Sequence, residues 1–136
     1  MSNTYQTDFY GWAMEQAELL RARRFAAADI ANIAEEIESM GRGEKRELVN
    51  RLAILLLHLL KWQFRPAFRS PSWNSSIREQ RIRLRQDLDD NPSLKSRLDE
   101  ALAKAYEPAS LRPERDFPKS SPYRFGQATD DAFWPE

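Results

Sequence analysis

The stretch Leu-Val-Asn-Arg-Leu-Ala-Ile-Leu-Leu-Leu-His-Leu-Leu-Lys-Trp-Gln-Phe, residues 48 to 64, is the most apolar part of the chain. At about 100° of turn per residue, its apolar side chains cover an arc of about 220°, which is wider than the stripe of a surface helix. Each leucine left exposed on such a helix would forgo about 1.5–3 kcal/mol of burial. The pattern therefore predicts a buried central helix with neighbours on at least two sides.

A membrane-spanning helix is the first alternative for this stretch. A span needs about 20 consecutive apolar residues. Here Arg51 and Lys61 bracket the apolar run, and His58 interrupts it. We therefore expect a protein that does not associate with a membrane.

The composition points to one ordinary intracellular domain. A chain of 136 residues is long enough for a single hydrophobic core, so we expect one helical-bundle domain over residues 1–136. The chain has no cysteine, which excludes disulfides, thiolate metal sites and cysteine nucleophiles. The first residues carry no secretory signal pattern, and this favours a cytoplasmic location. The 21 basic and 21 acidic side chains cancel, which argues against bulk electrostatic coating of nucleic acid.

Two amphipathic helices are expected before the central one. Asp8 suits the N-cap of the first. The second, at about 28–41, has isoleucines on one side and acids on the other, and Gly41 suits its C-terminal cap. Arg42 and Gly43 would then form a short turn, so that the second helix folds back on the central helix as a hairpin.

Prolines organise the second half of the chain. Ser70, Asn91 and Ser121 each precede a proline, an arrangement suited to a helix start. We expect helices at 71–90 and 92–106 and a short one at 122–129. Three prolines within 107–121, followed by Pro122, make 107–121 an irregular connector, and the terminal segment 122–136 should pack on the bundle through Trp134. The expected fold is all-α, with about five main helices around the central one.

Several motifs spread over the chain carry a family resemblance. They are Thr7-Asp8-Phe9-Tyr10 with Trp12, Glu35-Glu36-Ile37-Glu38-Ser39-Met40-Gly41, His58-Leu59-Leu60-Lys61-Trp62, Ser72-Trp73, Ile77-Arg78-Glu79-Gln80-Arg81 and Phe133-Trp134-Pro135. With these motifs the chain resembles the bacterial family catalogued as domain of unknown function 29, over nearly its whole length. The resemblance implies an all-helical fold and no established activity.

An acidic cluster and a single histidine are the only hints of catalytic or metal chemistry. The acids are Glu35, Glu36 and Glu38, and the imidazole is His58. Carboxylates and imidazoles on facing helices can bind metal ions. In the expected hairpin, however, Glu36 and His58 would lie about 15 Å apart along the helix axis. We therefore expect no metal and no cofactor, and we favour a non-enzyme. The alternative is a metal-dependent or acid/base enzyme that uses these groups.

A basic segment offers the better candidate for a binding surface. Residues 61–85 carry a net charge of +6. The candidate residues lie on the central helix and on the helix after it: Arg51, His58, Lys61, Trp62 and Arg65, then Arg78, Arg81 and Arg85. We rank internal ion pairing first, a protein partner or homo-oligomer second and nucleic acid third. The function we favour is non-catalytic binding of a macromolecule.

Overall fold

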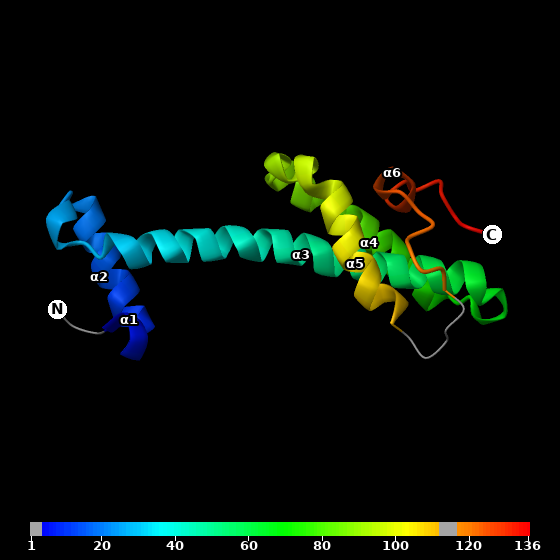
Figure 1. Cartoon of the computed structure of the whole chain (residues 1–136), viewed down its shortest axis with the longest axis horizontal. Helices are drawn as coiled ribbons and strands as arrows, with labels where there is room; N and C mark the ends of the chain where they lie inside the picture. The colour runs from blue at the N-terminus through cyan, green and yellow to red at the C-terminus, as the bar shows by residue number, and fades with distance from the viewer. Residues whose placement is uncertain (1–3, 112–116) are drawn as a thin grey trace. The chain divides into compact units, whose positions relative to one another are not determined.

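The computed structural model describes residues 4–111 and 117–136, and every regular element within those ranges is helical (Figure 1). In chain order the elements are α1 (Thr4–Thr7), α2 (Phe9–Arg21), the 3-10 turn η1 (Phe25–Ala27), α3 (Ile30–Phe64), the 3-10 turn η2 (Pro66–Phe68), α4 (Pro71–Asp90), the 3-10 helix η3 (Pro92–Arg97), α5 (Leu98–Ser110) and α6 (Phe125–Ala128). The expected all-α class is confirmed. Within the described ranges, no helix is long and apolar enough to cross a lipid bilayer.

The expected hairpin at Arg42 is wrong, because α3 is one helix of 35 residues that continues through this position. Gly41 and Gly43 both keep negative φ, so neither adopts the left-handed conformation of a helix cap. A glycine inside a helix costs about 1 kcal/mol relative to alanine, which the helix tolerates. The ion pair between Arg42 and Glu38, one turn apart, also spans Gly41.

The chain divides into two compact units, residues 1–43 and residues 44–136. The first contains α1, α2 and the start of α3, and the second contains the rest of α3 and the later helices. The expectation of one domain over 1–136 stays a prediction.

In the first unit, α2 begins as the sequence predicts. The side chain of Asp8 accepts a hydrogen bond from the backbone N–H of Gly11, at 3.0 Å. A Cβ atom on Gly11 would come within 2.4 Å of the Asp8 carboxylate, so any other residue there would require the capping side chain to shift. At its other end, α2 closes with Arg23 in the left-handed conformation, at φ 59°. The amide of Arg24 bonds back to the carbonyl of Leu19, which completes a Schellman cap.

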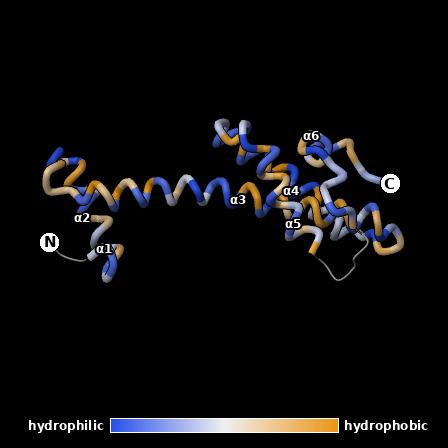
Figure 2. Tube along the Cα trace, in the orientation of Figure 1, coloured by the Kyte–Doolittle hydropathy of each residue, from blue (hydrophilic) through white to orange (hydrophobic). Residues whose placement is uncertain are grey.

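The second unit is built around the apolar half of α3. Seven of its leucines are buried: Leu48, Leu52, Leu55, Leu56, Leu57, Leu59 and Leu60. They form one core with Ile77 and Leu84 of α4 and with Ala101 and Ala105 of α5. Figure 1 shows α4 and α5 alongside this part of α3, and Figure 2 shows apolar residues recurring along all three helices. The prediction of a buried central helix is therefore confirmed for residues 48–64.

The ends of the later helices differ from expectation in detail. Ser70 caps α4 as predicted, with its Oγ accepting from the amide of Trp73 at 3.2 Å. Asn91 makes no such cap, and the segment after Pro92 is 3-10 before α5 begins. Similarly, α6 starts at Phe125, three residues beyond the expected start at Pro122.

The connector expected at 107–121 starts later, because α5 continues through Pro108 to Ser110. Two contacts hold this last turn in place. Ala109 is buried in the core, and the Tyr106 hydroxyl donates to the carbonyl of Pro118 at 2.5 Å. The rest of the expected connector includes residues 112–116, which lie outside the described residues.

The terminal segment packs on the second unit. Trp134 contacts Trp62 with the ring centroids 4.9 Å apart, and Phe133 meets Tyr123 edge to face at 5.7 Å. The buried hydroxyl of Tyr123 donates to Gln63 Oε1 at 2.5 Å and also lies 3.2 Å from the carbonyl of Leu59. These contacts tie the C-terminal end of the chain to α3.

Candidate interaction surfaces

Asp29 joins α2 to the start of α3 in the first unit. Its carboxylate accepts hydrogen bonds from Trp12 Nε1 at 3.0 Å and from Asn32 Nδ2 at 2.8 Å. Its backbone N–H donates to the side chain of Gln16 at 2.7 Å. The hydrogen bond from Asn32 is the main reason that the pKa of Asp29 lies below its usual value. Asp29 therefore stabilises this unit as a carboxylate.

Glu36, one of the three acids singled out in the sequence, is held by α1. The Tyr5 hydroxyl donates to Glu36 Oε1 at 2.5 Å. This hydrogen bond, with some burial, raises the pKa of Tyr5 to about 12. The Tyr5 ring also packs edge-on against Trp12, with the centroids 4.6 Å apart. Glu36 thus positions α1 against α3.

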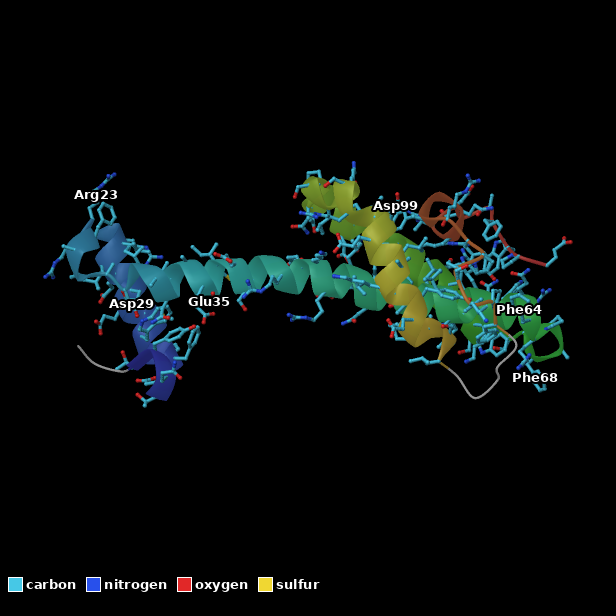
Figure 3. All side chains as sticks on the ribbon, in the orientation of Figure 1. Arg23, Asp29, Glu35, Phe64, Phe68 and Asp99 are labelled. Carbon is cyan, nitrogen blue, oxygen red and sulfur yellow. The ribbon has the colours of Figure 1, made fainter. Side chains whose placement is uncertain are left out.

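The other two acids pair with Arg42 on the surface of α3. Arg42 lies 3.0 Å from Glu35 and 3.5 Å from Glu38. The place of Glu35 on the helix is marked in Figure 3. Among the described residues, no group of three His, Cys, Asp or Glu side chains is placed to hold a metal ion. The acidic cluster is in the first unit and His58 is in the second, so the structure does not describe them as one site.

An apolar stripe lies exposed on the same part of α3. We define it as Ile30, Ala34, Ile37 and Gly41, which fall within about 60° of one another around the helix. Ile30 is 53% exposed and Ile37 is 60% exposed, and Met40 beside the stripe is 65% exposed. The sequence assigned these isoleucines to the buried side of a hairpin. Because α3 continues through Arg42, the expected hairpin does not cover them.

Exposed apolar residues are concentrated in this unit. Among the described residues, eight of the twelve exposed large hydrophobic side chains lie between Phe9 and Met40. The remaining four, Ile54, Phe68, Ile82 and Leu111, are spread over the second unit. Phe68 projects from the turn between α3 and α4 (Figure 3). The first unit therefore carries the larger share of apolar surface that a partner could cover.

The predicted basic residues of α3 have several local contacts within the second unit. Arg51 forms ion pairs with Glu47 and, at 3.0 Å, with Asp87 of α4. The Nδ1 of His58 donates to the carbonyl of Ile54 at 2.8 Å, one turn back on the same helix. These two contacts are typical of residues at the boundary between a helix and solvent.

Lys61 and Arg65 lie beside aromatic rings at the end of α3. The ammonium of Lys61 is 5.1 Å from the centroid of Trp73, and the guanidinium of Arg65 is 6.0 Å from that of Phe117. Together with Phe68, these four residues line a hollow of about 270 Å³. Trp62, the aromatic residue of the predicted surface, instead packs against Trp134 and under Arg69.

Arg81 is the most unusual of the predicted surface residues, because it is fully buried. Its Nε donates to the carbonyl of Ala128 at 2.8 Å, and its Nη2 donates to the carbonyl of Phe133 at 2.5 Å. The guanidinium also lies 5.1 Å from the Trp134 ring. Burial is the main cause that lowers its pKa from the usual value. Arg81 thus anchors the C-terminal segment and is not part of a surface.

Two further arginines hold the same segment. Arg85 donates to the carbonyl of Thr129 and to Asp131, at 3.3 and 3.1 Å. Arg69 donates to the carbonyls of Trp62 and Pro135, at 2.7 and 3.3 Å. Arg69 was not among the surface residues predicted from the sequence. Carbonyl acceptors leave no mark in a sequence, so only its place in the basic block of residues 61–85 could have suggested it.

Arg78 is the predicted residue that does lie open. Among the described residues it has no hydrogen-bond or ion-pair partner. It lines two hollows on the exposed side of α4, of about 450 and 430 Å³, and shares both with Ile82. The structure therefore places the predicted basic residues in different environments. Arg81 is internal, Arg51 and Arg85 are paired, and Arg78 is open.

Comparison with known proteins identifies a family. A family model described as "Domain of unknown function DUF29" matches residues 4–134, which include nearly all of both units. No curated protein and no solved structure matches the chain.

Proposed function

We propose that this chain, which belongs to the family of domain of unknown function DUF29, has a non-catalytic function and binds another protein or a second copy of itself. We also propose that the protein is bacterial and acts in the cytoplasm, as the sequence favours.

The observation that carries this proposal is the exposed apolar stripe on α3. Ile30 and Ile37 are both more than half exposed on a helix whose second half is buried. Burying one such side chain fully contributes about 1.5–3 kcal/mol. Contiguous exposed apolar residues on a folded unit are typical of protein interaction sites. The stripe is therefore the part of the molecule best suited to a partner.

Nucleic acid is supported less well. Several of the arginines counted in the basic segment are engaged within the second unit. Arg69, Arg81 and Arg85 hold the C-terminal segment, and Arg83 pairs with Glu79 at 3.1 Å. Affinity for a phosphate backbone comes mainly from several cations that neutralise phosphates. A mobility-shift titration at low salt tests this alternative, which requires binding that weakens steeply as salt is added.

The enzyme alternative also receives little support. Glu36 accepts a hydrogen bond from Tyr5, Glu35 pairs with Arg42, and the Nδ1 of His58 donates to a carbonyl of its own helix. These contacts favour structural roles for the residues that the alternative would use as acid, base or metal ligands.

The test compares two isoleucine substitutions. Ile37 in the stripe and Ile82 on α4 are both exposed, at 60% and 49%, so glutamate at either position leaves the core intact. Cells that produce the tagged natural chain or one of the two tagged variants are treated with a cross-linker, and the tagged chain is isolated with any protein linked to it. We expect a cross-linked protein, either a second copy or another chain, with the natural sequence and with Ile82→Glu, and its loss with Ile37→Glu. Retention of every cross-linked product in Ile37→Glu would contradict the proposal.

A further inference from the structure

The residues of the apolar stripe alternate in size. Ile30, Ala34, Ile37 and Gly41 follow one another at intervals of four, three and four residues, the alternation of four and three that is found along a coiled-coil seam. Along this seam each large side chain is followed by a small one. A second helix that packs against the seam therefore meets a row of alternating ridges and hollows.

The seam is complementary to itself when it is reversed. If two copies pack their stripes antiparallel around a twofold axis, Ile30 of one copy lies opposite Gly41 of the other, and Ala34 lies opposite Ile37. Each isoleucine then meets a small residue. In a parallel pair in register, isoleucine would meet isoleucine, and two glycines would face each other across a gap.

We infer that the apolar stripe binds the same stripe of a second copy of this chain in antiparallel orientation, with Ile30 seated over Gly41. This inference rests on the proposed function and names its partner.

The surroundings of Gly41 within its own chain also support the inference. A glycine in an exposed helix costs about 1 kcal/mol relative to alanine. A Cβ atom at Gly41 would meet no other atom of the described chain within 4 Å, so packing within one chain does not require glycine. A close approach by a second helix favours a small side chain at this position. Gly43 is equally open but lies off the stripe, and nothing in the structure explains it.

The size and charge of the surface indicate a reversible dimer. A stable interface buries about 800 Å² on each partner, which is more than four stripe residues and Met40 provide. Glu38 lies beside the stripe, about 40° from its edge around the helix, where it pairs with Arg42, and the antiparallel pair brings Glu38 of the two copies near each other. Association should therefore depend on concentration and should strengthen when salt screens the acids.

Cysteine cross-linking tests both the partner and the orientation, because the natural chain has no cysteine. Three single variants are made: Ile30→Cys, Gly41→Cys and the control Ser39→Cys, which lies on the opposite side of α3. A disulfide requires Cα atoms within about 7 Å. In the antiparallel pair, position 30 of one chain faces position 41 of the other, whereas the same position in the two chains is separated by about 16 Å along the axis.

We expect a mixture of Ile30→Cys and Gly41→Cys chains to form mixed disulfides at least roughly tenfold faster than the Ser39→Cys control. Either variant alone should behave like the control. Rapid linkage of Ile30→Cys to itself would overturn the antiparallel orientation, and control-level rates in all samples would overturn the second copy as partner.

The two proposals fail in different ways. If cross-linking in cells still yields a different protein that Ile37→Glu loses, only the second copy is excluded and the proposed function stands. If Ile37→Glu loses nothing, the proposed function fails as well.

Discussion

Arg81→Met should destabilise the second unit, because it removes the buried group that holds the C-terminal segment. Arg81 is fully buried and donates to the carbonyls of Ala128 and Phe133 at 2.8 and 2.5 Å. Methionine fills a similar volume without a donor, so both carbonyls lose their hydrogen bonds from the guanidinium.

The expected loss follows from these contacts. A hydrogen bond from a charged donor contributes about 1.5–3 kcal/mol, and Arg81 makes two. Removing the charge from the interior offsets part of this loss, since a buried ion carries a desolvation penalty of several kcal/mol. That penalty is enlarged because Arg81 Nη1 is buried without a hydrogen-bond partner among the described residues. We expect a net loss of about 3 kcal/mol in the free energy of unfolding.

The assay is urea unfolding followed by far-UV circular dichroism. With a urea dependence of about 2 kcal/mol per molar, the loss moves the unfolding midpoint down by about 1.5 M. Arg78→Met is the matched control, because Arg78 precedes Arg81 on α4 and is exposed. Its midpoint should change little. If the two variants unfold at the same midpoint, Arg81 does not anchor the C-terminal segment as described.

Three further predictions concern a helix cap, the ion pairs of one glutamate and a tyrosine hydrogen bond. Arg23→Gly should stabilise the first unit by about 1 kcal/mol in urea unfolding, because φ at Arg23 is 59° and glycine adopts that conformation without strain; destabilisation would contradict the cap. Hydrogen bonds from Lys45 and Lys104 lower the pKa of Glu100 to about 2. The stability that ionised Glu100 adds to the fold is therefore present above pH 4.5 and is lost as the pH falls to about 2. In acid unfolding, the stability of Glu100→Gln should depend less on pH than that of the control Asp99→Asn. The hydrogen bond to Glu36 raises the pKa of Tyr5 to about 12, so the stability that Tyr5 provides below pH 10 is lost towards pH 12. Helicity measured by circular dichroism should therefore decline over this pH range in the natural chain and decline less in Tyr5→Phe. An equal decline in both chains would refute the role of the hydrogen bond.

The sequence was sufficient for the parts of the fold that depend on local patterns. The wide apolar arc of residues 48–64 predicted the buried half of α3, and Asp8 and Ser70 predicted the starts of α2 and α4. Gly41 misled the prediction, because glycine suits both a helix cap and an exposed helix interior. Only the surrounding structure distinguishes these two uses.

The candidate surface was less predictable for a physical reason. The sequence shows that arginines are abundant in 61–85 but not what they bind. Acidic partners were expected, and Arg51 does pair with Asp87. Arg69, Arg81 and Arg85 instead use main-chain carbonyls of the C-terminal segment, which every residue possesses. The apolar stripe was recognised as an apolar face but was assigned to the interior, because the hairpin was expected to cover it.

The most direct test of the account is the rate at which an introduced cysteine at position 37 reacts with a thiol reagent, measured against Ser39→Cys over a range of protein concentrations. In dilute solution we expect Ile37→Cys and Ser39→Cys to react at similar rates, because both positions are exposed. As the concentration rises, position 37 alone should become protected. Slow labelling of position 37 at every concentration would mean that its own chain covers the stripe. Fast labelling at every concentration would mean that no second copy binds there.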